Sequence, residues 1–432
     1  MRILFLTPQL PYPPRQGTQI RNYHLVQAAA GTHDVDLLSF VRPEEDMGSA
    51  PRREGACPLP PVDVAANGLL SLCRRVETVP APCRSRWSRL RSLITSVEPD
   101  LAHRLASQGF AAALTSLLQI ERYDVVQVEG LEMSRYIPII RALAPQASIL
   151  FDDHNVEHLL QTRAAAVDSH RLSGWPRAAY SLVQSQKLRR YEARACQASD
   201  AVLVVSEADA RALRDLRTGV SIHVVPNCVD VQYYQRDPMA TPQPASLLFT
   251  GTMDYRPNVD AVAWFATDVL PLILALRPDV RVRIVGRSPS AIVKRLAEKH
   301  PNLQVIGAVE DVRPYFSEST LFVVPIRMAG GARLKILESM AMGLPVVSTP
   351  MGAEGIELAD GRECLLAAGA DSFATSVLQL LEDPALRTRL ALAGRQIVEE
   401  RYDWNRVAPR LLGVYAGLAR DTGAHKDETS VT

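Results

Sequence analysis

A predicted helix in the second half of the sequence begins with residue types that could bind a phosphorylated ligand. Gly330 and Gly331 precede a helical pattern over residues 332–342, and Arg333 and Lys335 place two positive charges at its start. Exposed backbone N–H groups at a helix amino terminus, together with the helix dipole, favour an anion. The pattern therefore indicates a phosphate site, although a tight turn before an ordinary surface helix has the same signature.

Glu338 follows one helical turn later, at the edge of an apolar face formed by Leu334, Leu337 and Ala341. A carboxylate beside an apolar face is costly unless a hydrogen-bond donor meets it. The paired hydroxyls of a ribose would supply that donor, so the helix suits a nucleoside diphosphate. The alternative is structural, because Lys335 and Glu338 stand at i and i+3 and could form a surface ion pair.

A second group of polar residues follows the apolar strand pattern over residues 148–152. Asp152, Asp153 and His154 lie at the carboxyl end of that strand, where open α/β sheets bind ligands. A histidine in this position can hydrogen-bond a polar substrate. A capping or loop histidine is the structural alternative.

The same histidine opens the pattern HxxEH, which is completed by Glu157 and His158. On a helix, the two histidines would share a face and could bind zinc, with the glutamate as general base. A zinc metalloprotease is therefore an alternative function. Because His154 follows a strand closely, we expect it at a strand end or in a loop, and this placement argues against the zinc site.

Two series of alternating strands and helices must position these residues. The first begins with the apolar run Arg2–Thr7, and the second begins with the strand pattern over residues 247–250. A proline-containing segment without periodicity separates them. This order predicts an α/β protein with two doubly wound, Rossmann-like domains facing a deep cleft. The expected boundaries are 1–228 for the first domain, 229–245 for the linker, 246–403 for the second domain and 421–432 for a disordered tail.

The composition limits the classes of function. The chain has 432 residues and a formal net charge of +1 at pH 7, so its overall charge gives no reason to expect nucleic-acid binding. The six cysteines form no CxxC pair, as expected of free thiols in a reducing compartment. The opening MRILFLTP is too short for a secretory segment, and no apolar run reaches the ~18 residues of a spanning helix. We therefore expect a cytoplasmic protein.

Three common enzyme motifs are missing from the sequence. No GxGxxG follows a strand, no GxxxxGK precedes Ser or Thr, and no GxSxG occurs. These patterns mark dinucleotide sites, P-loops and hydrolase nucleophile elbows. We therefore expect no bound cofactor.

Residues 84–96 have the pattern of a basic amphipathic helix. Its apolar stripe consists of Trp87, Leu90 and Ile94, and the surrounding cations are Arg84, Arg86, Arg89 and Arg91. Such a helix can lie in the headgroup layer of an anionic membrane. The alternative is a helix that packs on its own domain and exposes a solvated basic face.

Five segments resemble motifs of the retaining nucleotide-sugar glycosyltransferases of family 4, which have the GT-B fold. They are MRILFLTPQLPYPPRQGTQIRNYHL, FDDHNVEH, VVPNCVD, LFTGTMDYRPNVDAVAWF and GGARLKILESMAMGLPVVSTPMGAEGI. The resemblance covers nearly the whole chain. It implies two Rossmann-like domains and a terminal helix over residues 404–420 that returns to the first domain.

The resemblance also implies roles for individual residues. His154 would contact the donor sugar, and Glu338 would hold the ribose hydroxyls. Arg333 and Lys335 would neutralise the leaving diphosphate. The glycines expected to line the donor or its approach are Gly17, Gly251, Gly307, Gly330 and Gly331.

The sequence departs from the family pattern at two positions. Gly330 stands where the family carries the first of two glutamates, which contacts the transferred sugar. Thr252 stands where the family usually has an arginine that binds the diphosphate. A non-catalytic sugar-nucleotide-binding relative is therefore a further alternative.

The resemblance predicts a retaining, hexosyltransferase-type enzyme that moves a sugar from a nucleoside-diphosphate sugar to a hydroxyl acceptor. Its expected role is in cell-surface polysaccharide or glycolipid assembly. The expected partners are the nucleotide-sugar donor, a glycan or lipid-linked acceptor and an anionic membrane surface, with no nucleic acid. Because side-chain cations and backbone N–H groups can stabilise the leaving diphosphate, we expect no requirement for a metal.

Overall fold

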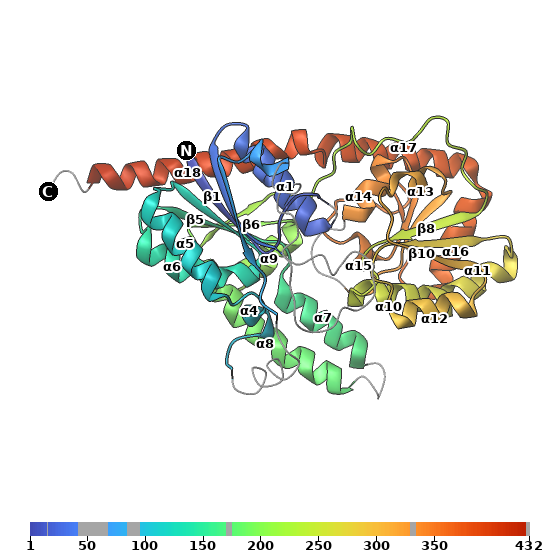
Figure 1. Cartoon of the computed structure of the whole chain (residues 1–432). Coiled ribbons are helices and arrows are strands. Elements are labelled where there is room, and N and C mark those ends of the chain that lie inside the picture. The colour runs from blue at the N-terminus through green and yellow to red at the C-terminus, as the bar shows by residue number, and fades with distance from the viewer. Residues whose placement is uncertain (15, 42–67, 84–95, 170–174, 329–333, 429–432) are drawn as a thin grey trace. The chain divides into compact units, whose positions relative to one another are not determined.

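The computed structural model describes the chain except residues 15, 42–67, 84–95, 170–174, 329–333 and 429–432 (Figure 1). The described chain forms two compact units, with boundaries between Pro226 and Asn227 and between Arg406 and Val407. The first unit therefore contains the start of the chain and most of its last helix. The second unit contains the intervening segment.

The first unit is built on a seven-stranded sheet with the order β3-β2-β1-β4-β5-β6-β7, in which all paired strands are parallel. Its strands are β1 Arg2–Thr7, β2 Asp34–Val41, β3 Arg75–Pro80, β4 Val125–Glu129, β5 Ser148–Asp153, β6 Ala201–Val204 and β7 Ser221–Val224. Its helices are α1 Gly17–Ala30, α4 Asp100–Arg104, α5 Gln108–Ile120, η2 Leu131–Tyr136, α6 Ile137–Leu143, α7 Glu157–Ser169, α8 Trp175–Gln197, α9 Glu207–Arg214 and the terminal α18 Trp404–Glu428.

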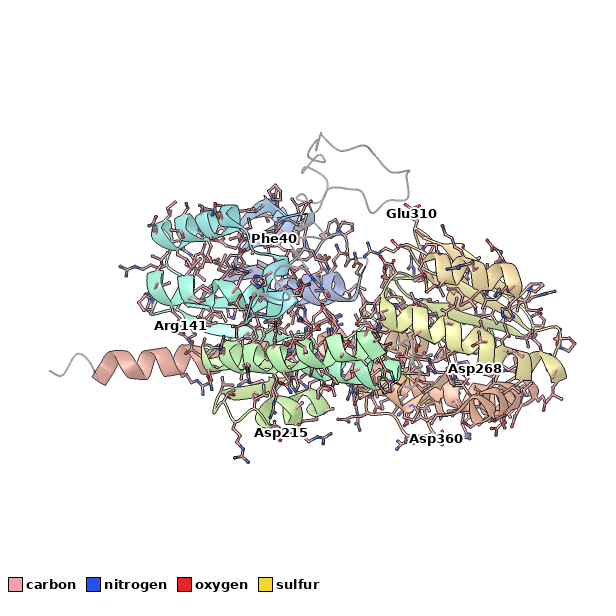
Figure 2. All side chains as sticks on the ribbon, turned by 90° about the horizontal axis from the view of Figure 1, so that it is seen from below. Phe40, Arg141, Asp215, Asp268, Glu310 and Asp360 are labelled. Atoms are coloured by element: carbon pink, nitrogen blue, oxygen red, sulfur yellow. The ribbon has the colours of Figure 1, made fainter. Side chains whose placement is uncertain are left out.

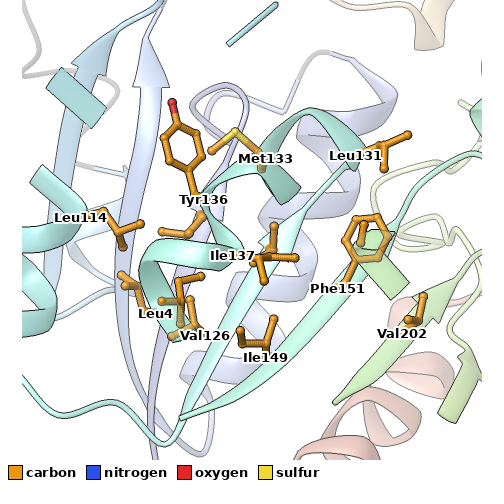
Figure 3. Packing of buried hydrophobic residues seen from close by; sticks show 14 of the residues in the cluster. Leu4, Leu114, Val126, Leu131, Met133, Tyr136, Ile137, Ile149, Phe151 and Val202 are labelled. Atoms are coloured by element: carbon orange, nitrogen blue, oxygen red, sulfur yellow. The ribbon is translucent and has the colours of Figure 1, made fainter. Parts of the chain in front are cut away.

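The core of the first unit is formed by apolar side chains from neighbouring strands. Leu4, Val126 and Ile149 come from β1, β4 and β5 and are fully buried in one layer (Figure 3). Phe40 stacks on Phe110 with ring centroids 4.4 Å apart. Strands covered on both faces must be apolar along their whole length, which explains the continuous apolar runs in the sequence.

The second unit repeats this architecture with a six-stranded sheet of order β10-β9-β8-β11-β12-β13. Its strands are β8 Ser246–Thr250, β9 Arg281–Val285, β10 Leu303–Gly307, β11 Leu321–Val324, β12 Val346–Ser348 and β13 Leu365–Leu366. Its helices are α10 Arg256–Trp264, the π-helical turn η4 Phe265–Val269, α11 Leu270–Leu276, α12 Ala291–Lys299, α13 Arg313–Ser317, α14 Leu334–Ala341, α15 Pro350–Ala353, α16 Ala370–Glu382 and α17 Pro384–Arg401.

Both units expose charged side chains on their surface. Asp215 in the first unit and Asp268 and Glu310 in the second are exposed (Figure 2). Within the described chain, one continuous helix, Arg256–Leu276, is long and apolar enough to cross a membrane. Several of its apolar side chains are fully buried in the second unit, namely Ala261, Ala266, Val269, Leu270 and Ile273. We therefore interpret it as a core helix.

The structure differs from the sequence expectation at two places. Strand β3, Arg75–Pro80, was not predicted, because its half-buried residues alternate neither in polarity nor in size. The expected disordered tail is helical as far as Glu428, because α18 continues through it. Extending an existing helix needs no new nucleation, and residues 421–428 contain no proline to end it.

Candidate active site

Helix α14 presents Glu338 to a partner within the second unit. The Tyr234 hydroxyl donates a hydrogen bond of 2.9 Å to Glu338 Oε1. Burial raises the pKa of Glu338, and the bond from Tyr234 acts in the opposite direction. The donor that this carboxylate requires therefore comes, in this structure, from the segment before β8.

Lys335 lies on the same helix, and a hydrogen bond and a contact with an aromatic ring help to position its ammonium group. Its Nζ donates to Asn258 Oδ1 at 2.9 Å and stands 4.3 Å from the centre of the Phe249 ring. Asn258 Nδ2 in turn donates to the carbonyl oxygen of Thr252 at 2.9 Å. The ammonium group is thus fixed beside the loop that follows β8.

Glycines allow this close approach at the carboxyl ends of neighbouring strands. Gly251 has φ +149°, and a Cβ there would lie 2.7 Å from Asn258 Nδ2 and 2.8 Å from Lys335 Nζ. A Cβ on Gly286, with φ +153°, would lie 1.7 Å from the Gly251 oxygen. The Gly286 N–H donates to Gly307 O at 2.8 Å, and Gly307 has φ +87°. Gly251 and Gly286 therefore leave no room for a Cβ, and Gly307 has a left-handed backbone conformation that larger residues rarely adopt.

The structure brings together part of the predicted donor site. Lys335, Glu338 and Gly251 lie in one region, and Gly307 adjoins it through Gly286. Gly330, Gly331 and Arg333 lie outside the described residues. Tyr234 and Asn258 were not predicted. The only sequence signal for Asn258 was its place at the start of a helix after a glycine-containing turn.

In the first unit, a buried charge cluster surrounds His154. Its Nε2 lies 2.8 Å from Glu129 Oε2, at the end of β4, and 3.4 Å from Asp152 Oδ2, at the end of β5. Arg21 of α1 pairs with both oxygens of Asp152 at 2.8 Å and donates to the Val225 carbonyl at 2.9 Å. Gly17 is the first residue of the same helix, so its contribution is to start α1 one turn before Arg21.

The cluster controls the protonation of His154. Burial acts to lower the pKa of His154, but the charge and hydrogen bond of Asp152, together with Glu129, outweigh it and raise the pKa to about 9. Burial and the charge of Asp152 raise the pKa of Glu129 to about 7. At neutral pH the histidine is therefore an imidazolium.

The His154 cluster continues to the last helix. Gln127 Nε2 donates to Glu129 Oε1 at 2.6 Å. The hydroxyl of Tyr415, on α18, is hydrogen-bonded to Gln127 Oε1. Gln127, Glu129 and Tyr415 are fully buried. Side chains from β4 and α18 thus fix the carboxylate that contacts the imidazole.

The two histidines of the HxxEH pattern do not form a zinc site. His154 precedes α7, which begins at Glu157, and His158 Nδ1 contacts Glu192 instead of sharing a partner with His154. Glu129, Asp152 and His154 form a group compact enough to hold a metal ion. Because the Arg21 guanidinium already pairs with both oxygens of Asp152, this group fits an ion-pair network better than a divalent cation.

Glu129→Gln is expected to lower the pKa of His154 from about 9, because one of the two carboxylates that raise it is removed. The raised pKa of His154 also makes the stability depend on pH. The stabilisation from the protonated imidazole is fully present below pH about 6.5, and it is lost as the pH rises through about 9. Histidine NMR titration measures the shift, with His154→Gln identifying the resonance.

A matched control for Glu129→Gln is Glu98→Gln, at a half-buried pair where Glu98 Oε2 lies 3.9 Å from His103 Nε2. It should change the free energy of unfolding by less than about 1 kcal/mol. An unchanged His154 titration in Glu129→Gln would show that the contact between the two side chains does not set the charge.

Solved structures of similar fold extend over almost the whole chain. Sucrose-phosphate synthase from Thermosynechococcus elongatus has a TM-score of 0.68 and 17% identity, covering 97% of this chain and 99% of that one. HepE from Anabaena, in complex with UDP and glucose, has a TM-score of 0.66 and 14% identity, covering 96% and 100%. The two doubly wound units and these neighbours define a GT-B fold, which confirms the predicted fold class.

The sequence comparisons identify the family. The family model described as Glycosyltransferase Family 4 matches residues 16–233, half of the chain, and that described as Glycosyl transferases group 1 matches residues 244–383. The chain therefore belongs to glycosyltransferase family 4. A phosphatidyl-myo-inositol mannosyltransferase of Mycolicibacterium smegmatis is 30% identical over 221 residues, 48% of this chain and 56% of that protein. The chain spans about half the length of the curated relatives it matches.

Proposed function

We propose that this protein is a retaining glycosyltransferase that moves a sugar from a nucleoside-diphosphate sugar to a hydroxyl acceptor in cell-surface polysaccharide or glycolipid assembly. The observation that carries the proposal is the fixed ammonium group of Lys335, one helical turn from Glu338. On this helix, the Lys335 cation could bind a diphosphate and the nearby Glu338 carboxylate could bind a ribose. A neighbour solved with UDP and glucose and a relative named for phosphatidyl-myo-inositol support the donor and acceptor classes.

In the proposed reaction, negative charge grows on the diphosphate as the bond to the sugar breaks. Lys335, and Arg333 beside it in the sequence, would stabilise that charge, so a metal is not required. The leaving phosphate oxygen would take the proton of the acceptor hydroxyl. His154 would contact the donor sugar as an imidazolium whose charge Glu129 and Asp152 balance.

We place the protein in the cytoplasm. The five described cysteines are free thiols, and four of them, Cys73, Cys196, Cys228 and Cys364, are buried. This usage supports a reducing compartment. A second candidate function is sugar-nucleotide binding without transfer, which Gly330 favours because it replaces the family's sugar-contacting glutamate.

A thermal-shift panel of UDP, GDP, ADP and dTDP sugars would test the proposal. One donor should raise the melting temperature, and the protein should then hydrolyse that donor slowly without acceptor. Binding without hydrolysis or transfer would instead support the second candidate function. Activity that survives a chelator would support the metal-independent reaction, and activity that needs an added metal would contradict it.

Glu338→Gln is expected to weaken nucleoside-diphosphate binding about 10- to 100-fold, because hydrogen bonds to a charged group contribute about 1.5–3 kcal/mol. Isothermal titration calorimetry with the donor chosen by the panel measures it. Tyr234→Phe is the matched variant, since it removes the chain's own donor and leaves the carboxylate for the ribose. Unaltered affinity in a folded Glu338→Gln protein would assign Glu338 a structural role.

A further inference from the structure

Helix α8 turns polar side chains inward and apolar side chains outward over its first half. Its buried residues there include Ser181, Gln184 and Ser185. Its exposed residues include Trp175, Tyr180, Leu182 and Val183, with exposed fractions of 61, 42, 54 and 51%. Soluble proteins seldom leave a contiguous group of large apolar side chains in water. This exposed α8 face therefore requires an explanation.

Hydrogen bonds determine which side of α8 faces inward. Ser185 Oγ lies 2.9 Å from the carbonyl oxygen of His158 and 2.7 Å from Thr162 Oγ1, so both contacts join α8 to α7. Gln184 Oε1 accepts from the backbone N–H of Asp100 at 3.1 Å. The two helices pack side by side (Figure 1). These hydrogen bonds hold the polar side of α8 against the rest of the first unit. The apolar side chains on the opposite side of the helix therefore point outward.

The exposed α8 face continues along the second half of the helix, where its side chains are basic. Its exposed cations are Arg189, Arg190 and Arg194. At about 100° per residue, these arginines stand on the side of the helix that carries Leu182 and Val183. Glu192 is buried and accepts a hydrogen bond of 3.2 Å from the backbone N–H of His158. The exposed positions that the structure describes on α8 thus combine apolar side chains and cations without a carboxylate.

We propose that the exposed α8 face docks onto an anionic lipid bilayer. Its apolar side chains can enter the boundary between headgroups and acyl chains, while its arginines pair with lipid phosphates. Tryptophan and tyrosine favour that boundary because their rings are apolar with a polar edge. A second copy of the chain fits less well, because an identical face offers the arginines no negative partner. The docking does not depend on the proposed reaction.

Co-sedimentation of the purified chain with vesicles tests the charge contribution. The vesicles contain phosphatidylcholine with about 30% phosphatidylglycerol, at low ionic strength. Replacing the three exposed arginines of α8 by glutamine should lower the partition coefficient about fivefold per arginine, and about 0.5 M salt should weaken wild-type binding as well. The matched control replaces the exposed cations Lys294, Arg295 and Lys299 of α12 and should change binding less than about threefold.

The apolar contribution has its own variant. Leu182→Ser combined with Val183→Ser should lower binding about tenfold or more, whereas Ile292→Ser, at an exposed position of α12, should leave it unchanged. Brominated lipid should quench the fluorescence of Trp175, and Trp175→Phe should abolish that quenching. Quenching that persists in Trp175→Phe, or a wild-type chain that does not sediment with anionic vesicles, overturns the proposal.

Two further outcomes would assign the exposed α8 face to another occupant and also overturn the proposal. A dimer by light scattering that becomes a monomer in the Leu182→Ser, Val183→Ser variant would place the face between two copies. A fall of more than about 5 °C in the melting temperature of that variant would show that the chain itself covers the face. Membrane docking instead predicts an unchanged mass and a melting temperature within about 2 °C of the wild type.

Discussion

The Lys335→Ala variant is expected to transfer sugar about 30- to 150-fold more slowly than the wild type. Lys335 Nζ is fixed by Asn258 and the Phe249 ring, so it is preorganised to meet the diphosphate as its charge grows. Losing a charge-assisted hydrogen bond to a phosphate costs about 2–3 kcal/mol, which corresponds to that range of rates. Initial rates at saturating acceptor measure the effect.

Two variants separate the charge of Lys335 from its position. Lys294→Ala removes an exposed lysine of the same unit and should leave the rate within about twofold. Gly251→Ala keeps the charge, but its Cβ would stand 2.8 Å from Nζ and displace it, so transfer should fall. A loss below about threefold in Lys335→Ala, with an unchanged circular dichroism spectrum, would remove this lysine from the site.

Arg21→Leu is expected to lower the free energy of unfolding of the first unit by about 3–5 kcal/mol. Arg21 is 1% exposed and donates two hydrogen bonds of 2.8 Å to Asp152 and one of 2.9 Å to the Val225 carbonyl. Without it, Asp152 keeps a buried charge that has lost its guanidinium partner. Urea unfolding at neutral pH, followed by circular dichroism, measures the difference.

The loss of unfolding free energy in Arg21→Leu should depend on pH. Burial acts to raise the pKa of Asp152, but the charges of Arg21 and His154 outweigh it and hold that pKa well below its usual value. The pair therefore stabilises the fold fully above pH about 4, and this stabilisation is lost as the pH falls through the lower native value. The control Arg214→Ala breaks an exposed pair at 3.5 Å and should cost less than about 1 kcal/mol. An equally small cost in Arg21→Leu would contradict a buried ion pair.

The sequence predicted the buried strands most closely. Arg2–Thr7 coincides with β1, and the strand patterns over residues 148–152 and 247–250 lie within β5 and β8. Each is a short apolar run whose environment requires it to be apolar throughout. Strand β3 was missed because it lies at the edge of its sheet, pairs with β2 alone and has half-buried residues.

The candidate site could be predicted only where its residues are close in sequence. Lys335 and Glu338 share one helix, so helical spacing was enough to associate them. Their partners Asn258 and Tyr234 come from 77 and 104 residues away, and Arg21 is 131 residues from Asp152. Contacts over such separations depend on the order of the strands in the sheet and on the path of the loops. Neither of these produces a periodic pattern in the local sequence.

The contact between Tyr415 and Gln127 makes helix α18 part of the support for the proposed sugar-binding histidine. A truncation before Tyr415 would remove the hydroxyl that is hydrogen-bonded to Gln127 Oε1, and the amide that donates to Glu129 would lose this support. A late stop codon would thus damage the enzyme more than its position suggests. A purification tag should therefore leave α18 whole.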